Sequence, residues 1–186
     1  MNGYRVNGLW DQRHHEHNAR VTNAHVNAEH YVRDIPGAGI YANTTTGASK
    51  TNINSLEVAR LPDSGSPYVS FQVIRPAFWL DGIVTLQILY SHSASSQAAV
   101  VDMVAGAARA GSEAANISDI SEALTFPAST ANQLEWLDAS VGLPVDGSHD
   151  LLGWKLTRDS ANGSDGTAVL RISGVRLTYI PRRQEI

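Results

Sequence analysis

The sequence predicts an all-β chain: an antiparallel β-sandwich preceded by an extended or partly helical N-terminal arm. From about residue 37 onward, short apolar runs alternate with polar residues in steps of two and are separated by turn residues, which is typical of half-buried strands. Before Pro36-Gly37, branched aliphatic residues are sparse. With 186 residues, 42% of them hydrophobic, the chain has enough material for one compact core and an appendage.

Residues 1–36 form the predicted arm, which we expect to serve attachment or oligomerisation. So little apolar surface cannot offset the entropy of ordering a chain, so we expect a neighbour, such as another copy of the arm, to order it. Helix and extended chain both remain open for this segment. The predicted docking contacts are its sparse apolar residues, namely Trp10, Val21, Val26, Tyr31 and Val32.

The predicted sandwich, residues 37–186, opens with two alternating runs. Each follows a stretch with good turn chemistry, residues 62–67 before the first run and Asp81-Gly82 before the second. Residues two apart on a strand point to the same side. The buried faces are therefore predicted to carry Val69, Phe71 and Val73 in the first run, and Val84, Leu86, Ile88 and Tyr90 in the second.

The most regular alternation lies near the C-terminus, where two apolar runs flank residues 158–166. In the first run Leu152, Trp154 and Leu156 share one face, and the second run extends over residues 169–180. The stretch between them is polar and glycine-rich, as a solvent-exposed loop between antiparallel strands should be. We therefore predict that the two runs form a hairpin-like couple.

Residues 97–115 are rich in valine and alanine, a composition that suits either a strand or an amphipathic helix. The valine cluster favours a strand, and Gly106 and Gly111 would interrupt a helix. We predict a strand followed by a loop.

Composition excludes several classes of function. The net charge is −4 and the 14 lysines and arginines are scattered, so no nucleic-acid partner is expected. No leader is recognisable and no apolar run approaches the roughly 20 residues of a membrane span, so we expect a soluble chain without a membrane partner. The chain has no cysteine. It also lacks an activated serine, a zinc-hydrolase spacing and a convincing carboxylate cluster, so we expect neither an enzyme nor a cofactor.

Two groups of metal-ligating residue types are candidate sites. His15 and His17 form a His-x-His pair, and three copies around a threefold axis would bring six imidazoles to a transition metal, although solvated histidines are the alternative. In the loop after residue 157, Asp159, Asn162 and Asp165 offer oxygen ligands for calcium. The alternative there is a turn network in which Arg158 pairs with the two aspartates.

Three short motifs close the predicted sandwich: residues 156–159 (LTRD), Ser164-Asp165, and residues 175–179 (VRLTY). With these motifs the chain from about residue 54 to residue 179 resembles a jelly-roll-like domain of tailed-bacteriophage virion proteins. The resemblance implies a homotrimer on the virion surface, a capsid decoration or head-fibre protein whose arm docks on the major capsid protein. A neck or tail fibre or adaptor protein is the neighbouring alternative.

A carbohydrate-binding module that contacts host surface glycans is an alternative of a different class. Such a module presents exposed aromatic side chains on which sugar rings stack. Trp79 and Trp136 are candidates for this role or for contacts between subunits, with core packing as the alternative for each. Trp154 is expected in the core because it shares a face with Leu152 and Leu156.

Overall fold

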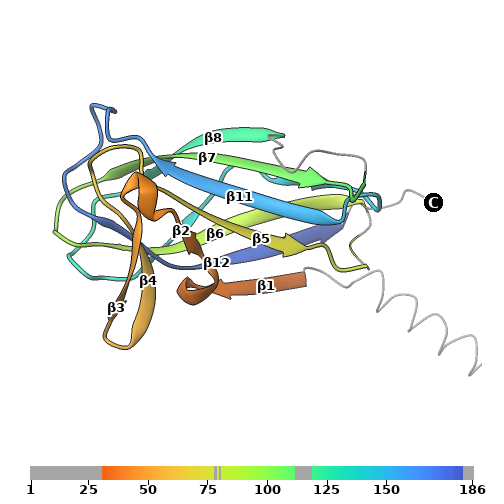
Figure 1. Ribbon diagram of the computed structural model, residues 1–186, viewed down its shortest axis with the longest axis horizontal. Coiled ribbons are helices and arrows are strands. Elements are labelled where there is room, and N and C mark those ends of the chain that lie inside the picture. The colour runs from red at the N-terminus through yellow and green to blue at the C-terminus, as the bar shows by residue number, and fades with distance from the viewer. Residues whose placement is uncertain (1–30, 78, 80, 112–118, 182–186) are drawn as a thin grey trace, which may run out of the picture. The chain divides into compact units, whose positions relative to one another are not determined.

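Two antiparallel sheets face each other across one core in this protein (Figure 1). The computed structural model describes residues 31–77, 79, 81–111 and 119–181, and the chain from Val32 onward forms a compact unit. The predicted antiparallel β-sandwich is confirmed. Within the described residues, no helix has both the length and the apolar character needed to cross a membrane.

Seven strands form the first sheet, called sheet A. They follow the order β10-β6-β12-β4-β3, with β1 paired to β12 and β9 paired to β6. The long strands β6 and β12 form its centre and pair along nearly their whole length. The bounds are β1 (Tyr31–Pro36), β3 (Ser49–Ile53), β4 (Leu56–Leu61), β6 (Gly82–His92), β9 (Glu135–Asp138), β10 (Leu143–Val145) and β12 (Leu170–Pro181).

Five strands form the second sheet, called sheet B, in the order β2-β5-β11-β7-β8. Two short 3-10 turns, η1 (Gly37–Gly39) and η2 (Thr44–Thr46), flank β2 on either side in the chain. Asn43 caps η2 by accepting hydrogen bonds from the backbone amides of Thr45 and Thr46. The bounds are β2 (Tyr41–Ala42), β5 (Tyr68–Ile74), β7 (Ala99–Ala108), β8 (Ile120–Phe126) and β11 (Leu151–Arg158).

The core lies between the two sheets and contains the residues that the alternation assigned to it. Every predicted inward residue of β5, β6 and β11 is buried, including Trp154, which stacks on Phe71 with ring centroids 5.5 Å apart. On β12 a register shift between Ile172 and Gly174 reverses the alternation. Ile172 before the shift and Val175 after it therefore both face the core.

The strand predicted within residues 97–115 is confirmed as β7, which lies between β11 and β8. The predicted hairpin-like couple is wrong, because β11 belongs to sheet B and β12 to sheet A. Alternation identifies the apolar face of each strand, and the apolar faces of β11 and β12 are both buried in the same core. The connection between them crosses from one sheet to the other.

The described end of the predicted arm is part of the sandwich. Tyr31–Pro36 forms β1 and pairs with β12, and Asp34 accepts a hydrogen bond at 2.7 Å from Arg176 of that strand. Only Ile35 of β1 packs against the core, which is why the segment reads as an arm in the sequence. The compact unit begins at Val32, whereas the sequence suggested a boundary after residue 36.

Stability should depend on pH through His92, whose side chain is completely buried at the end of β6. Its Nε2 lies 3.0 Å from the Pro127 carbonyl oxygen, and Tyr90 packs edge-on against the ring. Burial lowers the pKa of His92 below its ordinary value of 6.5. The unfolded chain therefore binds a proton more readily than the folded one, and the free energy of unfolding should fall as the pH drops below about 6.5.

Urea unfolding at pH 7.5 and pH 5.5 checks this expectation. The wild-type chain should lose stability between the two values. A His92→Gln variant keeps an amide donor for Pro127 but does not titrate, so its loss should be smaller. An equal loss in both proteins would show that His92 is not the responsible group.

Candidate functional site

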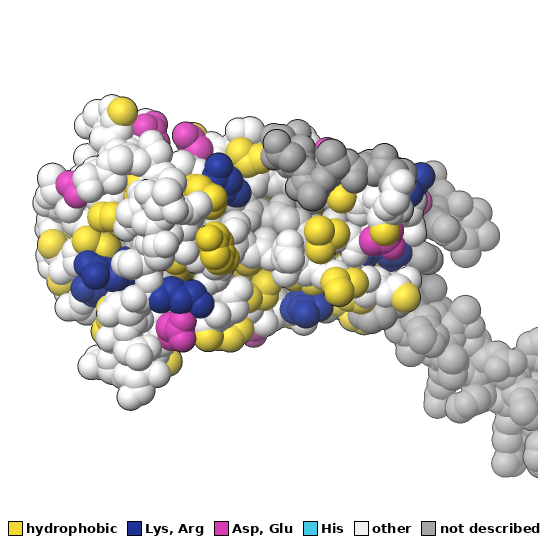
Figure 2. All heavy atoms as spheres, viewed as in Figure 1, with side chains coloured by type: hydrophobic (Ala, Val, Ile, Leu, Met, Phe, Trp, Pro, Cys, Tyr) yellow, Lys and Arg dark blue, Asp and Glu magenta, His cyan; other side chains and the backbone are white. Residues whose placement is uncertain are grey.

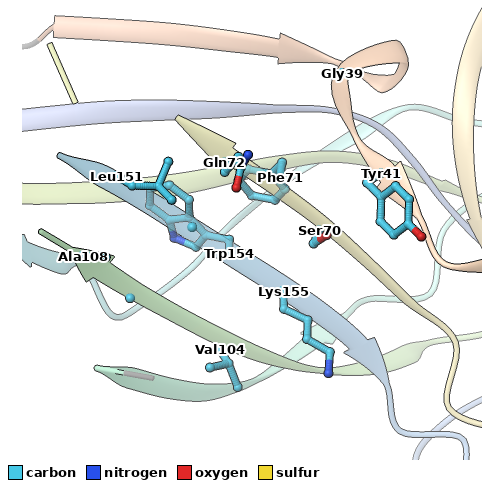
Figure 3. Close-up of a pocket in the computed structure, with 12 residues that line it drawn as sticks. Gly39, Tyr41, Ser70, Phe71, Gln72, Val104, Ala108, Leu151, Trp154 and Lys155 are labelled. Atoms are coloured by element: carbon cyan, nitrogen blue, oxygen red, sulfur yellow. The ribbon is translucent and has the colours of Figure 1, made fainter. Parts of the chain in front are cut away.

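The outer face of sheet B carries a regular array of side chains across its strands. The register places Tyr41 of β2 opposite Ser70 of β5, Ser70 opposite Lys155 of β11, and Lys155 opposite Val104 of β7. Because paired residues point to the same side of a sheet, these four form one row across four strands. Figure 3 shows the row running from Tyr41 to Val104.

A second row, two residues away on each strand, contains two glycines among its three residues. It consists of Gln72 on β5, Gly153 on β11 and Gly106 on β7. A Cβ atom added to Gly153 would meet nothing within 4 Å. The centre of the sheet face is therefore open where side chains would normally stand.

A third row, which contains Ile74, Leu151 and Ala108, closes the far side of the glycine row. The first and third rows are four residues apart along β11, or about 13 Å at 3.3 Å per residue. Between them lies an open hollow of about 580 Å³. This volume falls within the range of small-molecule sites, about 300–1,000 Å³.

Aromatic and aliphatic side chains border the hollow and remain accessible. Tyr41, which lines the hollow, is 59% exposed. Ile74, the register partner of the lining residue Leu151, is 75% exposed. Figure 2 shows a pale area without coloured side chains over the middle of β11, with hydrophobic side chains around it. On the core side of β5 and β11, the stacked rings of Phe71 and Trp154 lie beneath the hollow.

Polar groups at the hollow have hydrogen-bonding capacity to spare. The Lys155 ammonium lies 4.3 Å from the centre of the Tyr68 ring, which fixes its position without using its donors. Within the described part of the chain, neither the Lys155 ammonium nor the Gln72 side-chain amide forms a hydrogen bond. The hollow thus combines an exposed aromatic ring with free donors and one amide acceptor.

The loop residues that the sequence singled out lie elsewhere, beside the core. Arg158 is fully buried and forms an ion pair with Asp165, whose side chain is 2% exposed, with 3.0 Å between Nη2 and Oδ2. Asp165 Oδ1 also accepts a hydrogen bond from the backbone amide of Val100. Asp159 is not part of this pair, and its carboxylate lies 3.4 Å from the side-chain nitrogen of Asn162.

This arrangement does not suit a calcium ion at Asp159 and Asp165. Both oxygens of Asp165 already accept hydrogen bonds from Arg158, so a cation would have to displace a buried guanidinium. In the described ranges, no three His, Cys, Asp or Glu side chains gather closely enough to hold a metal ion.

The remaining predicted site residues divide into three groups. Trp10, His15, His17, Val21 and Val26 lie outside the described residues. Tyr31 and Val32 lie on β1 and are 37% and 56% exposed. Among the tryptophans, Trp79 is buried against Tyr179, whereas Trp136 on β9 is 46% exposed and lies under the Arg176 guanidinium.

Sequence reasoning missed the hollow, although one signal pointed to it. Gly153 occupies an outward position in the strongest alternating run of the chain, and Gly106 occupies an outward position in β7. Glycine inside a strand often marks a place where a ligand or another backbone approaches closely. Only the pairing of β11 with β7 shows that the two glycines adjoin.

Comparison with known proteins identifies the fold. No protein-family model matches the chain, and no curated protein matches its sequence. Among solved structures, the C-terminal CBM6 of a marine laminarinase from Zobellia galactanivorans is similar, with a TM-score of 0.53 and 13% identity over 80% of this chain and 99% of that chain. The carbohydrate-binding module CBM36, solved with calcium and xylotriose, has a TM-score of 0.51 and 14% identity over 78% and 98% of the two chains.

The same fold also occurs within larger proteins of other kinds. The tryptic core of a Bacillus thuringiensis Cry1Da variant has a TM-score of 0.55 and 9% identity over 81% of this chain. The chain spans about a quarter of the length of such larger proteins. At these identities the similarity establishes a jelly-roll-like β-sandwich, and function must be argued from the site.

Proposed function

We propose that this protein is a carbohydrate-binding module that holds a glycan in the hollow on the outer face of sheet B. The observation that carries the proposal is the glycine row, Gly153 and Gly106, set beside the exposed ring of Tyr41. Sugar rings present an apolar face and a rim of hydroxyl groups. An aromatic ring suits the face, and amide and ammonium groups such as those of Gln72 and Lys155 suit the rim.

The solved carbohydrate-binding modules with this fold support the same proposal. Binding rather than cleavage is proposed because glycoside hydrolysis generally requires two carboxyl groups flanking the scissile bond. The described residues that line the hollow include no aspartate or glutamate. Host surface glycans are the proposed ligands if the chain is a virion protein. The virion location, the homotrimer and the capsid or tail partners stay predictions from the sequence.

A glycan panel with one substitution on each sheet tests the proposal. The wild-type chain should bind at least one class of plant, microbial or animal glycan. Tyr41→Ala should weaken that binding about tenfold or more, because Tyr41 is the exposed aromatic residue that borders the hollow. Trp136→Ala is the matched control, since Trp136 is a similarly exposed aromatic residue on sheet A and should leave the affinity unchanged.

Two outcomes would contradict the proposal. One is the absence of binding to any glycan in the panel. The other is an inverted result, in which Trp136→Ala removes binding and Tyr41→Ala does not, because it would place the site on the opposite sheet.

A further inference from the structure

The outer face of sheet A holds two arginines directly opposite each other on neighbouring strands. Arg60 of β4 and Arg171 of β12 are register partners. Ser49 lies opposite Arg60 on one side, and Ser91 lies opposite Arg171 on the other. Like charges directly opposite each other on adjacent strands are destabilising, so this pairing requires an explanation.

No acidic side chain neutralises the two arginines within the described residues. The ion pairs found there join Lys50 to Glu57, Arg158 to Asp165 and Arg176 to Asp34, and His149 lies near Asp146. Burial, and secondly the positive charge of Arg60, lower the pKa of Arg171. The guanidinium of Arg171 is held in place by a hydrogen bond to the Asn132 side chain, while its Nε is buried without an acceptor in the described residues.

A small hollow of about 80 Å³ adjoins Arg171. This volume is well below that of a drug-sized site and suits a single functional group. Its polar lining offers the hydroxyls of Ser91 and Ser173 and the amide of Asn54. Asn54 stands over the hollow because it and Ser55 form the two-residue turn between β3 and β4, in which both residues have positive φ.

We propose that Arg60 and Arg171 form a binding site for an oxyanion, a carboxylate or a sulfate-type group, on the outer face of sheet A. Guanidinium groups pair with such anions through parallel hydrogen bonds, and an anion between them would relieve their repulsion. Apolar side chains adjoin Arg171, because Leu56 and Leu134 line the hollow beside it and are 54% and 46% exposed. The ligand therefore carries its anionic group on a larger body.

The site is separate from the proposed glycan surface, which lies on sheet B. The anionic group can belong to an acidic sugar or to a simple organic acid, and both present the same chemistry to the arginines. Failure of one proposal leaves the other standing, because each has its own residues and its own probes.

An NMR titration of the full chain, which follows the chemical shifts of backbone amides and arginine side chains, tests the oxyanion site. We would titrate with sodium sulfate, sodium acetate, sodium butyrate and sodium glucuronate, each compared with sodium chloride at equal ionic strength. Saturable shifts are expected at Arg60, Arg171 and Ser91. Tighter binding of glucuronate than butyrate would identify an acidic sugar as the source of the anion, and the reverse order would identify an organic acid.

Two variants complete the test. Arg60→Gln should weaken anion binding at least tenfold, whereas Arg33→Gln, which removes an exposed arginine from β1 of the same sheet, should not change it. At low salt without added oxyanion, Arg60→Gln should raise the melting temperature by about 1–3 °C, because it removes the repulsion. Shifts that grow linearly and equally in all proteins would indicate charge screening only and would overturn the proposal, as would a melting temperature lowered by Arg60→Gln.

Discussion

Replacing Arg158 with methionine should destabilise the protein by about 3–5 kcal/mol, a large part of the stability of an ordinary domain. The Arg158 guanidinium donates to the carbonyl oxygens of Leu61 and Ala168, at 2.8 and 2.6 Å, and to that of Gly166. It also forms the ion pair with Asp165. The substitution leaves a buried carboxylate without its counter-charge and removes one donor from each of three carbonyl groups.

Chemical denaturation measures this loss, and two further variants interpret it. Asp165→Asn combined with Arg158→Met should be less destabilising than the sum of the two single changes, because the stranded charge disappears. Arg176→Met is the matched control, since its ion pair with Asp34 is exposed and its loss should leave the unfolding midpoint nearly unchanged. A loss below about 1 kcal/mol for Arg158→Met would show that the buried pair does not hold the two sheets together.

Replacing Gly153 with isoleucine should reduce glycan affinity about a hundredfold while leaving the fold intact. The new side chain would stand in the open centre of the hollow, where a Cβ meets no atom within 4 Å. Isoleucine also has a higher strand propensity than glycine, so the free energy of unfolding should stay constant or rise. Opposite effects on affinity and stability distinguish a blocked site from a damaged fold.

Gly163→Ile provides the control for this substitution. Gly163 lies in the connection between β11 and β12, outside the hollow, and a Cβ there also meets nothing within 4 Å. Isothermal titration with the glycan that binds best should therefore give the wild-type affinity for Gly163→Ile. Retention of full affinity by Gly153→Ile would exclude the centre of sheet B as the binding surface.

Much of the fold could be predicted because alternation reports directly on burial. Leu152, Trp154 and Leu156 alternate with glycine and lysine, and all three are buried. A different signal identified β7 despite its alanine content, because its valine cluster favoured a strand and Gly106 disfavoured a helix. The turn residues at positions 62–67 and Asp81-Gly82 indicated where β5 and β6 begin.

Pairing could not be predicted in the same way. The alternation in β11 and β12 does not indicate whether the two strands pair in one sheet or lie in opposite sheets. Both arrangements bury the same apolar faces. The buried pair of Arg158 and Asp165 lies at the crossing between the sheets, where the sequence offered only a choice between a metal-binding loop and a turn network. The distinction depends on which donors surround Asp165, and these come from β7 and β11.

The candidate site was the least predictable part. Its residues come from β2, β5, β7 and β11, which are distant in sequence and become neighbours only through the register of sheet B. In the sequence, histidines and aspartates are the evident candidates for a binding site, whereas this surface is defined by two glycines and a tyrosine. A glycine in a strand indicates a hollow on the sheet only when the strand pairing shows that a second glycine lies beside it.

The central claim is that a glycan binds across the glycine row of sheet B, and amide chemical-shift mapping tests it most directly. With a glycan that the panel selects, we expect the largest shifts at Gly106, Gly153 and Gln72, with smaller changes at Tyr41 and Lys155. Unchanged signals in this row, with shifts confined to the loops at the ends of the sandwich or to sheet A, would contradict the account.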